Sequence, residues 1–192
     1  MTTVTGQHQT GHHHQMENLM RTRTRSTTAV LSVAGLGLAA LATVGLGSSA
    51  QAASYTCDGV AATIVGTNGA DEIEGTSGRD VIVARGGSDE IDGNGGNDLI
   101  CAGSGSDEVD GGSGKDKIWG GSGRDEIDGD SGRDRIWGGT GNDELAGGSG
   151  NDKIWGNDGR DLLEGEGGKD VLKGGAGRDR VYQGEEPDHD DD

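Results

Sequence analysis

The stretch GGSGRDEIDGDSGRDRIW, residues 120–137, contains two copies of the nine-residue block that decides how this chain folds. Thirteen such blocks follow one another without an insertion from Gly66 to Tyr182. Every block has Gly at its fourth position, Asp at its sixth position and Ile, Leu or Val at its eighth position. The first position is Gly except at Ala84 and Ala102. Self-similarity at a short fixed period predicts a solenoid, in which each repeat stacks on its neighbours.

The residue types within a block indicate one strand and one turn. The eighth position is a single apolar residue between two mostly polar neighbours, as in a strand with one side chain directed inward. Positions 7 to 9 are therefore predicted to form a short strand, and positions 1 to 6 a turn whose glycines allow positive φ. The predicted fold class is all-β, a parallel β-roll (β-solenoid) of about thirteen nine-residue repeats, with two repeats per coil and odd and even strands in opposite sheets.

Each turn carries one Asp, and a carboxylate is a hard oxygen ligand suited to Ca²⁺. The pattern GGxGxDxUx, in which U is a large aliphatic residue, resembles RTX (hemolysin-type) calcium-binding repeats, which form parallel β-rolls. The resemblance implies that each Ca²⁺ lies between two stacked turns, held by backbone carbonyls and the sixth-position Asp, with a ceiling of about eleven ions. The ligands that it implies are Asp71, Asp80, Asp89, Asp98, Asp107, Asp116, Asp125, Asp134, Asp143, Asp152, Asp161, Asp170 and Asp179.

The second block position departs from the pattern most often, because it is Gly in only six blocks. Asn and Asp adopt the left-handed conformation more readily than other residues with a side chain, so Asn94, Asp130 and Asn157 are expected to fit. The residues expected to fit less readily are Thr67, Thr76, Arg85 and Glu166. We also expect the first and last coils to bind calcium most weakly.

The composition excludes a conventional core and disfavours nucleic acid as a partner. The 192 residues include 41 Gly and no Phe, and 34 acidic residues against 16 Lys and Arg give a net charge of −18. Nucleic-acid binding needs clustered Lys and Arg, whereas this charge favours multivalent cations. Composition alone also permits a disordered Gly/Asp-rich tract, which we expect in the absence of calcium, so that metal binding and folding coincide.

The region before the repeats has the parts of a secretory signal peptide. The apolar run AVLSVAGLGLAALATVGLG, residues 29–47, follows three arginines and precedes the A-x-A site at 50–52. We predict that residues 1–52 form a signal peptide with an N-terminal extension, removed near Ala52, and the alternative is a membrane anchor. Translation from Met20 instead of Met1 would give a signal of ordinary length. The mature protein is then secreted, without stable membrane insertion.

The mature chain is expected to have three parts. Residues 53–65 form an N-terminal cap strand, residues 66–182 form the β-roll, and residues 183–192 form an acidic disordered tail. Because the compartment reached by secretion is oxidising, Cys57 and Cys101 are predicted to form a disulfide. To reach Cys101, the cap must fold back across the outer face of the even-numbered strands.

The outward positions of the two sheets carry different side chains. Odd-numbered strands present mostly Glu and Asp, whereas three successive even-numbered strands present Lys117 with Trp119, Arg135 with Trp137, and Lys153 with Trp155. The tryptophans are one coil apart and should stack in register. They either shield the sheet or form a contact surface for glycan, a cell-wall polymer or another copy of the roll.

Catalysis is not expected from this sequence. The predicted mature chain has one histidine, His189 in the tail, and no nucleophile with a neighbouring base. The sequence therefore predicts a secreted, non-enzymatic calcium-binding protein. The alternative is an extracellular adhesion, matrix or cell-wall-associated protein that uses the cationic and tryptophan face, with calcium purely structural.

Overall fold

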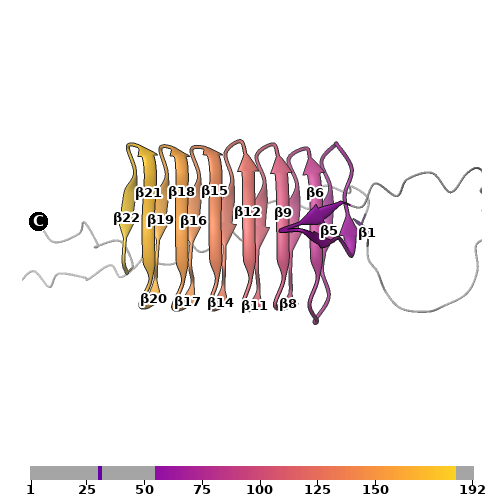
Figure 1. Cartoon of the computed structure of the whole chain (residues 1–192), viewed down its shortest axis with the longest axis horizontal. Helices are drawn as coiled ribbons and strands as arrows, with labels where there is room; N and C mark the ends of the chain where they lie inside the picture. The colour runs from indigo at the N-terminus through magenta and orange to yellow at the C-terminus, as the bar shows by residue number, and fades with distance from the viewer. Residues whose placement is uncertain (1–29, 32–54, 185–192) are drawn as a thin grey trace, which may run out of the picture.

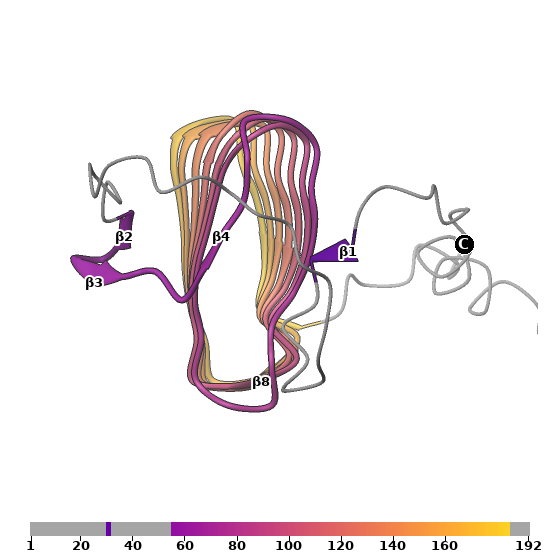
Figure 2. The same ribbon diagram turned by 90° about the vertical axis from the view of Figure 1, so that its right-hand side faces the viewer.

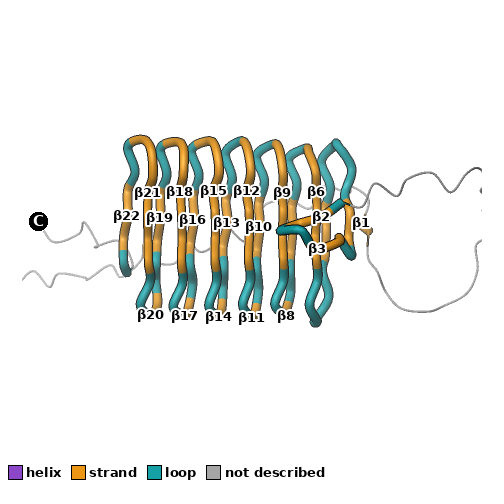
Figure 3. The backbone as a smooth tube through the Cα atoms, viewed as in Figure 1, coloured by secondary structure: helices purple, strands orange, loops and turns teal. Residues whose placement is uncertain are grey.

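The computed structural model describes residues 30–31 and 55–184, which form a β-solenoid of flattened coils (Figure 1). Strands alternate with turns along the described chain, and none of its residues is helical (Figure 3). Because there is no helix, nothing in this part of the chain meets the criteria for a membrane-spanning helix. The predicted all-β parallel roll is confirmed.

Two parallel sheets form the walls of the solenoid and a third closes one edge, as the view along the axis shows (Figure 2). The eight-stranded wall contains β1 (Val30–Leu31), β5 (Glu72–Glu74), β7 (Glu90–Asp92), β10 (Glu108–Asp110), β13 (Glu126–Asp128), β16 (Glu144–Ala146), β19 (Leu162–Glu164) and β22 (Arg180–Tyr182). The seven-stranded wall contains β4 (Ile64–Val65), β6 (Val81–Gly86), β9 (Leu99–Ser104), β12 (Lys117–Ser122), β15 (Arg135–Gly141), β18 (Lys153–Gly159) and β21 (Val171–Gly177). The five-stranded edge sheet contains β8 (Gly95–Gly96), β11 (Ser113–Gly114), β14 (Ser131–Gly132), β17 (Ser149–Gly150) and β20 (Gly167–Gly168).

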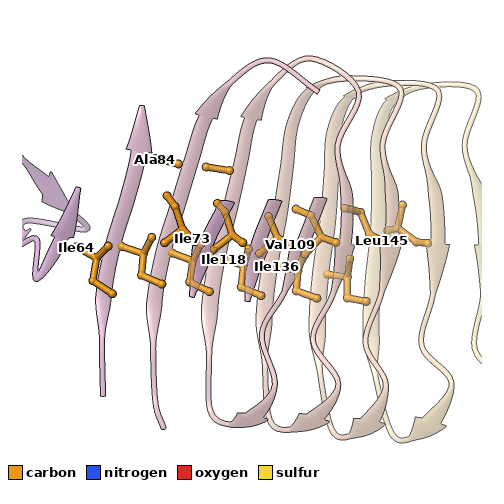
Figure 4. Packing of buried hydrophobic residues seen from close by; sticks show 14 residues of the cluster. Ile64, Ile73, Ala84, Val109, Ile118, Ile136 and Leu145 are labelled. Atoms are coloured by element: carbon orange, nitrogen blue, oxygen red, sulfur yellow. The ribbon is translucent and has the colours of Figure 1, made fainter. Parts of the chain in front are cut away.

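The register of every wall strand within the repeats is set by the 18-residue coil. Ile118 of β12 pairs with Ile100 on one side and with Ile136 on the other, and Val109 of β10 pairs with Ile91 and Ile127. The eighth-position side chains of both walls therefore meet in one narrow apolar core, which runs along the solenoid (Figure 4). A register slip would move these side chains to the outer face, so the alternation of apolar and polar residues fixes the pairing.

The strands of the seven-stranded wall are longer than the sequence predicts. From β6 onward they continue into the following block, through its third position in β6, β9 and β12 and through its fourth in β15, β18 and β21. The five-stranded sheet, made by third and fourth positions, is not predicted either. Glycines with positive φ, such as Gly121 at 111° and Gly123 at 134°, let the turn backbone stay extended and pair with the next coil. Polar turn residues carry no apolar alternation, so the sequence pattern did not reveal these strands.

An antiparallel hairpin covers the start of the seven-stranded wall. It consists of β2 (Thr56–Cys57) and β3 (Val60–Ala61), joined by Asp58 and Gly59, which both have positive φ as in a type I′ turn. Figure 2 shows the hairpin on the outer side of this wall. The Asp-Gly pair is a hairpin signal that our reading of the sequence missed.

A disulfide joins the hairpin to β9. The sulfur atoms of Cys57 and Cys101 are 2.03 Å apart, and their Cα atoms are 5.8 Å apart. Cys57 packs with Val81, Val83 and Leu99, so the segment does fold back over the apolar part of this face as predicted. The closed loop spans 44 residues, which in the chain-entropy model stabilises the fold by about 4 kcal/mol.

Close stacking of the turns predicts a difference between two fourth-position glycines. A Cβ on Gly123 would overlap the carbonyl oxygen of Gly105 on the preceding coil, whereas the nearest atom to a Cβ on Gly69 is Thr67 Oγ1 at 3.9 Å. Gly123→Ala should lower the free energy of unfolding of the folded roll by about 2–6 kcal/mol, because backbone strain and overpacking each cost about 1–3 kcal/mol. Gly69→Ala is the matched control and should change it little. Thermal unfolding followed by circular dichroism measures both, and equal losses would contradict the stacking.

Candidate metal sites

The predicted aspartates lie in two rows, one leading into each wall. The first row is Asp71, Asp89, Asp107, Asp125, Asp143, Asp161 and Asp179, and the second is Asp80, Asp98, Asp116, Asp134, Asp152 and Asp170. The ten from Asp80 to Asp161 are buried, with at most 6% of each residue exposed. Asp71, Asp170 and Asp179, on the terminal coils, are half-buried. The repeat thus places one carboxylate inside each interior turn.

One oxygen of each interior carboxylate joins neighbouring coils. The backbone N–H of Asp107 donates to Oδ1 of Asp125 at 3.1 Å, and the N–H of Asp116 donates to Oδ1 of Asp134 at 2.8 Å. Eleven such hydrogen bonds, all between residues 18 apart and 2.7–3.1 Å long, run through the two rows. The sixth-position Asp therefore has a structural role in addition to any role as a ligand.

The second oxygen has no partner in most turns. The buried Oδ2 atoms without a hydrogen bond belong to Asp89, Asp98, Asp107, Asp116, Asp125, Asp134, Asp143, Asp152, Asp161 and Asp170. An ionised carboxylate buried without a partner is costly, and removing the uncompensated charge needs a proton or a cation. Two rows of such atoms are hard oxygen ligands that fit Ca²⁺.

Backbone carbonyls lie close to the Oδ2 atoms that have no hydrogen-bond partner. A Cβ built on Gly120 would lie 2.6 Å from Asp125 Oδ2 and 2.6 Å from the carbonyl oxygen of Gly138 on the next coil. The absence of a first-position side chain therefore leaves room where a carboxylate and a carbonyl converge. No three acidic, His or Cys side chains converge on one point within residues 55–184, so a cation between coils would need carbonyls to complete its coordination.

Burial changes the proton affinity of these carboxylates. Desolvation raises the pKa of Asp125 and of Asp134 to about 7 and that of Asp116 and of Asp143 to about 6, although the backbone hydrogen bond to each opposes the shift. Desolvation also raises the pKa of five more members of the rows, Asp89, Asp98, Asp107, Asp152 and Asp161. The interior of the roll therefore disfavours the charged carboxylate unless a cation compensates it.

The first turn of each row differs from the others, because a threonine occupies the second position. Thr67 donates its backbone N–H to Asp71 Oδ2 at 2.6 Å, and its hydroxyl lies 3.0 Å from the same oxygen. Thr76 binds Asp80 Oδ2 in the same way, at 2.7 Å from N–H and 2.8 Å from the hydroxyl. These two carboxylates already have donors, which gives a physical reason to expect weak calcium binding at the first coil. In the sequence, these two turns are marked by Thr in place of Gly at the second block position.

The other second-position departures adopt the left-handed conformation. Asn94, Asp130 and Asn157 have φ of 64°, 62° and 73°, as expected. Of the four residues expected to fit less readily, Arg85 and Glu166 do adopt it, with φ of 85° and 59°, whereas Thr67 and Thr76 do not. Stacking on neighbouring coils holds the turn backbone in this conformation, and the rest of the coil compensates the strain.

The fold and the aspartate rows define the class of protein: a repeat solenoid with one carboxylate directed into each turn. Residues 65–100, 102–136, 128–163, 137–172 and 155–185 match the family model described as RTX calcium-binding nonapeptide repeat (4 copies). The matched segments cover more than half of the chain, which belongs to this family. Membership supports calcium binding by the repeats. No curated protein matches the sequence.

Replacing one interior carboxylate by an amide separates its two roles. Asp125→Asn keeps the oxygen that accepts the Asp107 N–H and removes a buried charge, so the metal-free roll should become more stable. The same change should raise the calcium midpoint of folding about tenfold, equivalent to about 1.4 kcal/mol, because a charged ligand is lost. Asp71→Asn is the control and should alter both quantities much less. Calcium titrations followed by circular dichroism test this, and equal effects at the two positions would contradict it.

The raised pKa values predict opposite pH effects with and without calcium. In the folded state Asp125 and Asp134 titrate at about 7, against 3.8 for an ordinary Asp, so protonation favours the metal-free fold. That stabilisation is complete below about pH 4 and is lost as the pH rises through about 6–7. Metal-stripped protein should therefore gain β signal in circular dichroism on acidification from pH 8. With calcium present, acid should instead raise the calcium midpoint. A metal-free spectrum that is constant from pH 8 to 4 would contradict the assignment.

Proposed function

We propose that the mature chain is a secreted calcium ion-binding protein that folds when Ca²⁺ binds between its stacked turns. The observation that carries the proposal is the double row of buried Oδ2 atoms without a hydrogen-bond partner. The proposed ligands are the thirteen sixth-position aspartates together with turn carbonyls, up to about eleven ions in all. The aspartates whose Oδ2 has no hydrogen bond are the principal ligands. Asp71 and Asp80 contribute least, because Thr67 and Thr76 donate hydrogen bonds to their Oδ2 atoms.

Charge supports coupling between binding and folding. The chain carries a net charge of −18, and the apolar core receives one aliphatic side chain per turn. Calcium supplies two positive charges at each space where a carboxylate is buried. Without this compensation the aspartate rows oppose stacking, both by desolvation and by mutual repulsion between neighbouring coils. Folding then depends on the metal, as in other small metal-dependent domains.

Secretion is supported by the sequence of the leader and by the disulfide, which persists in oxidising compartments. Apart from Val30–Leu31, the predicted signal peptide lies outside the described residues, as does most of the predicted acidic tail. Val30 and Leu31 form β1, which pairs with β5 at the end of the eight-stranded wall. Cleavage near Ala52 would remove β1 and leave β5 as an edge strand.

The second candidate function is adhesion or attachment to an extracellular matrix or cell wall, with calcium only structural. It is favoured by the face that carries both cations and tryptophans. The rings of Trp119 and Trp137 are stacked at 4.7 Å, and those of Trp137 and Trp155 at 4.9 Å. The predicted in-register stack is therefore confirmed, while a partner for this face is a proposal.

Calcium-dependent folding is tested with two triple variants of equal charge change. Asp116→Asn/Asp125→Asn/Asp134→Asn alters the interior rows, whereas Glu74→Gln/Glu90→Gln/Glu126→Gln alters exposed positions of the eight-stranded wall. Mature protein should change from a coil to a β spectrum on adding Ca²⁺ at millimolar or lower concentration. Mg²⁺ should be much less effective, since it requires near-octahedral geometry.

The interior variant should need much more calcium to fold, and the exterior variant should fold like the unmodified protein. A β spectrum in chelator at neutral pH would contradict metal-dependent folding. Equal shifts in the two variants would show that general charge, and not the interior rows, controls the response.

A further inference from the structure

The two walls of the roll carry opposite charges at equivalent positions. The seventh block position is Glu in the first five strands of the eight-stranded wall that belong to the repeats, from β5 to β16. In three successive strands of the seven-stranded wall it is Lys117, Arg135 and Lys153, which pair in register from coil to coil. In a chain with 34 acidic residues, this segregation leaves one face cationic.

A hollow of about 310 Å³ lies on this cationic side. It is lined by Lys115, Arg133 and Asn151 from three successive turns, by Arg135 and Lys153 from the strands that follow, and by Asp134. The four cationic residues are exposed, while Asp134 is buried and accepts the Asp116 N–H. The exposed lining therefore contains four cations and no carboxylate.

None of the cations of the hollow forms an ion pair with another residue that the structure describes. Among the described residues, ion pairs join Lys117 to Asp58 at 2.7 Å and Arg124 to Glu144 at 3.7 Å. Neither pair involves a cation of the hollow, although acidic residues outnumber basic ones two to one in this chain. Solubility does not require a cation at these positions. Glu occupies the same block position on the other wall, and an exposed Glu would keep this face soluble equally well.

The tryptophan row beside these cations has little free ring face. Trp137 is stacked between its two neighbours, with interplanar angles of 4° and 5°. Trp119 packs against the apolar cluster under the hairpin, and the register places Lys173 beside Trp155 on the next coil. A neutral sugar that stacks on an aromatic ring would find no free face on Trp137, and could stack only on the outer face of the terminal ring, Trp155. The larger part of this face is therefore left to the cations, with indole edges alongside.

We propose that the hollow and the cation row bind a linear anionic polysaccharide, one whose sugars carry carboxylates or sulfates, laid along the axis of the roll. Equivalent cations recur on three successive coils, about 4.8 Å apart, so the site offers a short straight row of charges to an extended, repeating polyanion. The indole edges beside the row fit the C–H edges of sugar rings. The site exists only on stacked coils, so this inference rests on the proposed calcium-dependent fold.

The test uses mature protein in calcium buffer, with β content measured in the same samples. The probes are hyaluronan, which carries carboxylates, and dextran sulfate, with uncharged dextran as the matched neutral polymer. Binding is followed by isothermal calorimetry at several salt concentrations, since association with a polyanion weakens linearly in log–log form as salt rises. Comparison of the two anionic probes shows whether carboxylate or sulfate is the group recognised.

The first variant removes the cations of the hollow: K115Q/R133Q/R135Q/K153Q. It should remain folded in calcium, weaken binding to an anionic polymer about tenfold or more, and show a shallower salt dependence.

The control removes four cations from the opposite edge and wall: R124Q/R160Q/R178Q/R180Q. Its net charge equals that of the first variant, but its affinity should change by less than about threefold, because these residues lie away from the hollow.

Folded protein that binds neither anionic polymer overturns the proposal, as do equal losses in the two variants. Equal affinity for oligodeoxythymidylate would show a general attraction to polyanions and would also overturn it. Self-association of the protein alone, abolished by the first variant, would assign the face to a second copy instead. A β spectrum in chelator would contradict metal-dependent folding but not this site, so the two proposals fail separately.

Discussion

The buried sixth-position carboxylate is the group on which the rest of the roll depends. In an interior turn such as that of Asp125, Oδ1 accepts the N–H of Asp107 on the preceding coil, while Oδ2 has no hydrogen-bond partner. The first contact stacks the coils, and the second leaves a charge that burial makes unfavourable. One side chain therefore both holds the solenoid together and creates the need for a cation. In such a turn the same side chain serves stacking through Oδ1 and the proposed metal binding through Oδ2.

The narrow core explains why the carboxylates have a larger influence on folding than the apolar side chains. Each turn contributes one large aliphatic side chain, such as Ile118 or Ile127, to a column that is only two walls wide. The coils meet closely at their turns, where fourth-position glycines stack against the carbonyls of the preceding coil. This geometry gives the polypeptide little apolar area per ordered residue, compared with a conventional domain. In the function proposed above, electrostatic compensation in the turns then supplies much of the driving force for folding.

The strict nine-residue period made the walls, their register, the disulfide crossing and the tryptophan stack predictable. Each follows from a repeated residue type or from counting coils, as with Trp119 and Trp137. The extension of β15 to Gly141 and the edge sheet were not predicted, because glycine-rich turns show no apolar alternation. The positions of the aspartates could be inferred from sequence. The hydrogen bonds that Thr67 donates to Asp71 Oδ2 could not be inferred. They depend on the conformation of the first turn of the row, which does not stack on a preceding repeat turn.

The coil also determines where this chain can differ from other rolls of the same repeat. Positions four, six and eight are constrained by stacking, by the carboxylate and by the core, so they cannot vary freely. Outward positions five, seven and nine have no such constraint, and each of these positions recurs on the next coil at the same height on the wall. A choice such as Lys or Arg at position seven becomes a straight row, as Lys117, Arg135 and Lys153 show. A compact ligand would contact only one or two members of such a row, whereas an extended and repetitive ligand contacts them all. The stacking of the coils therefore favours the proposed linear partner over a compact one, whichever cation occupies each position of the row.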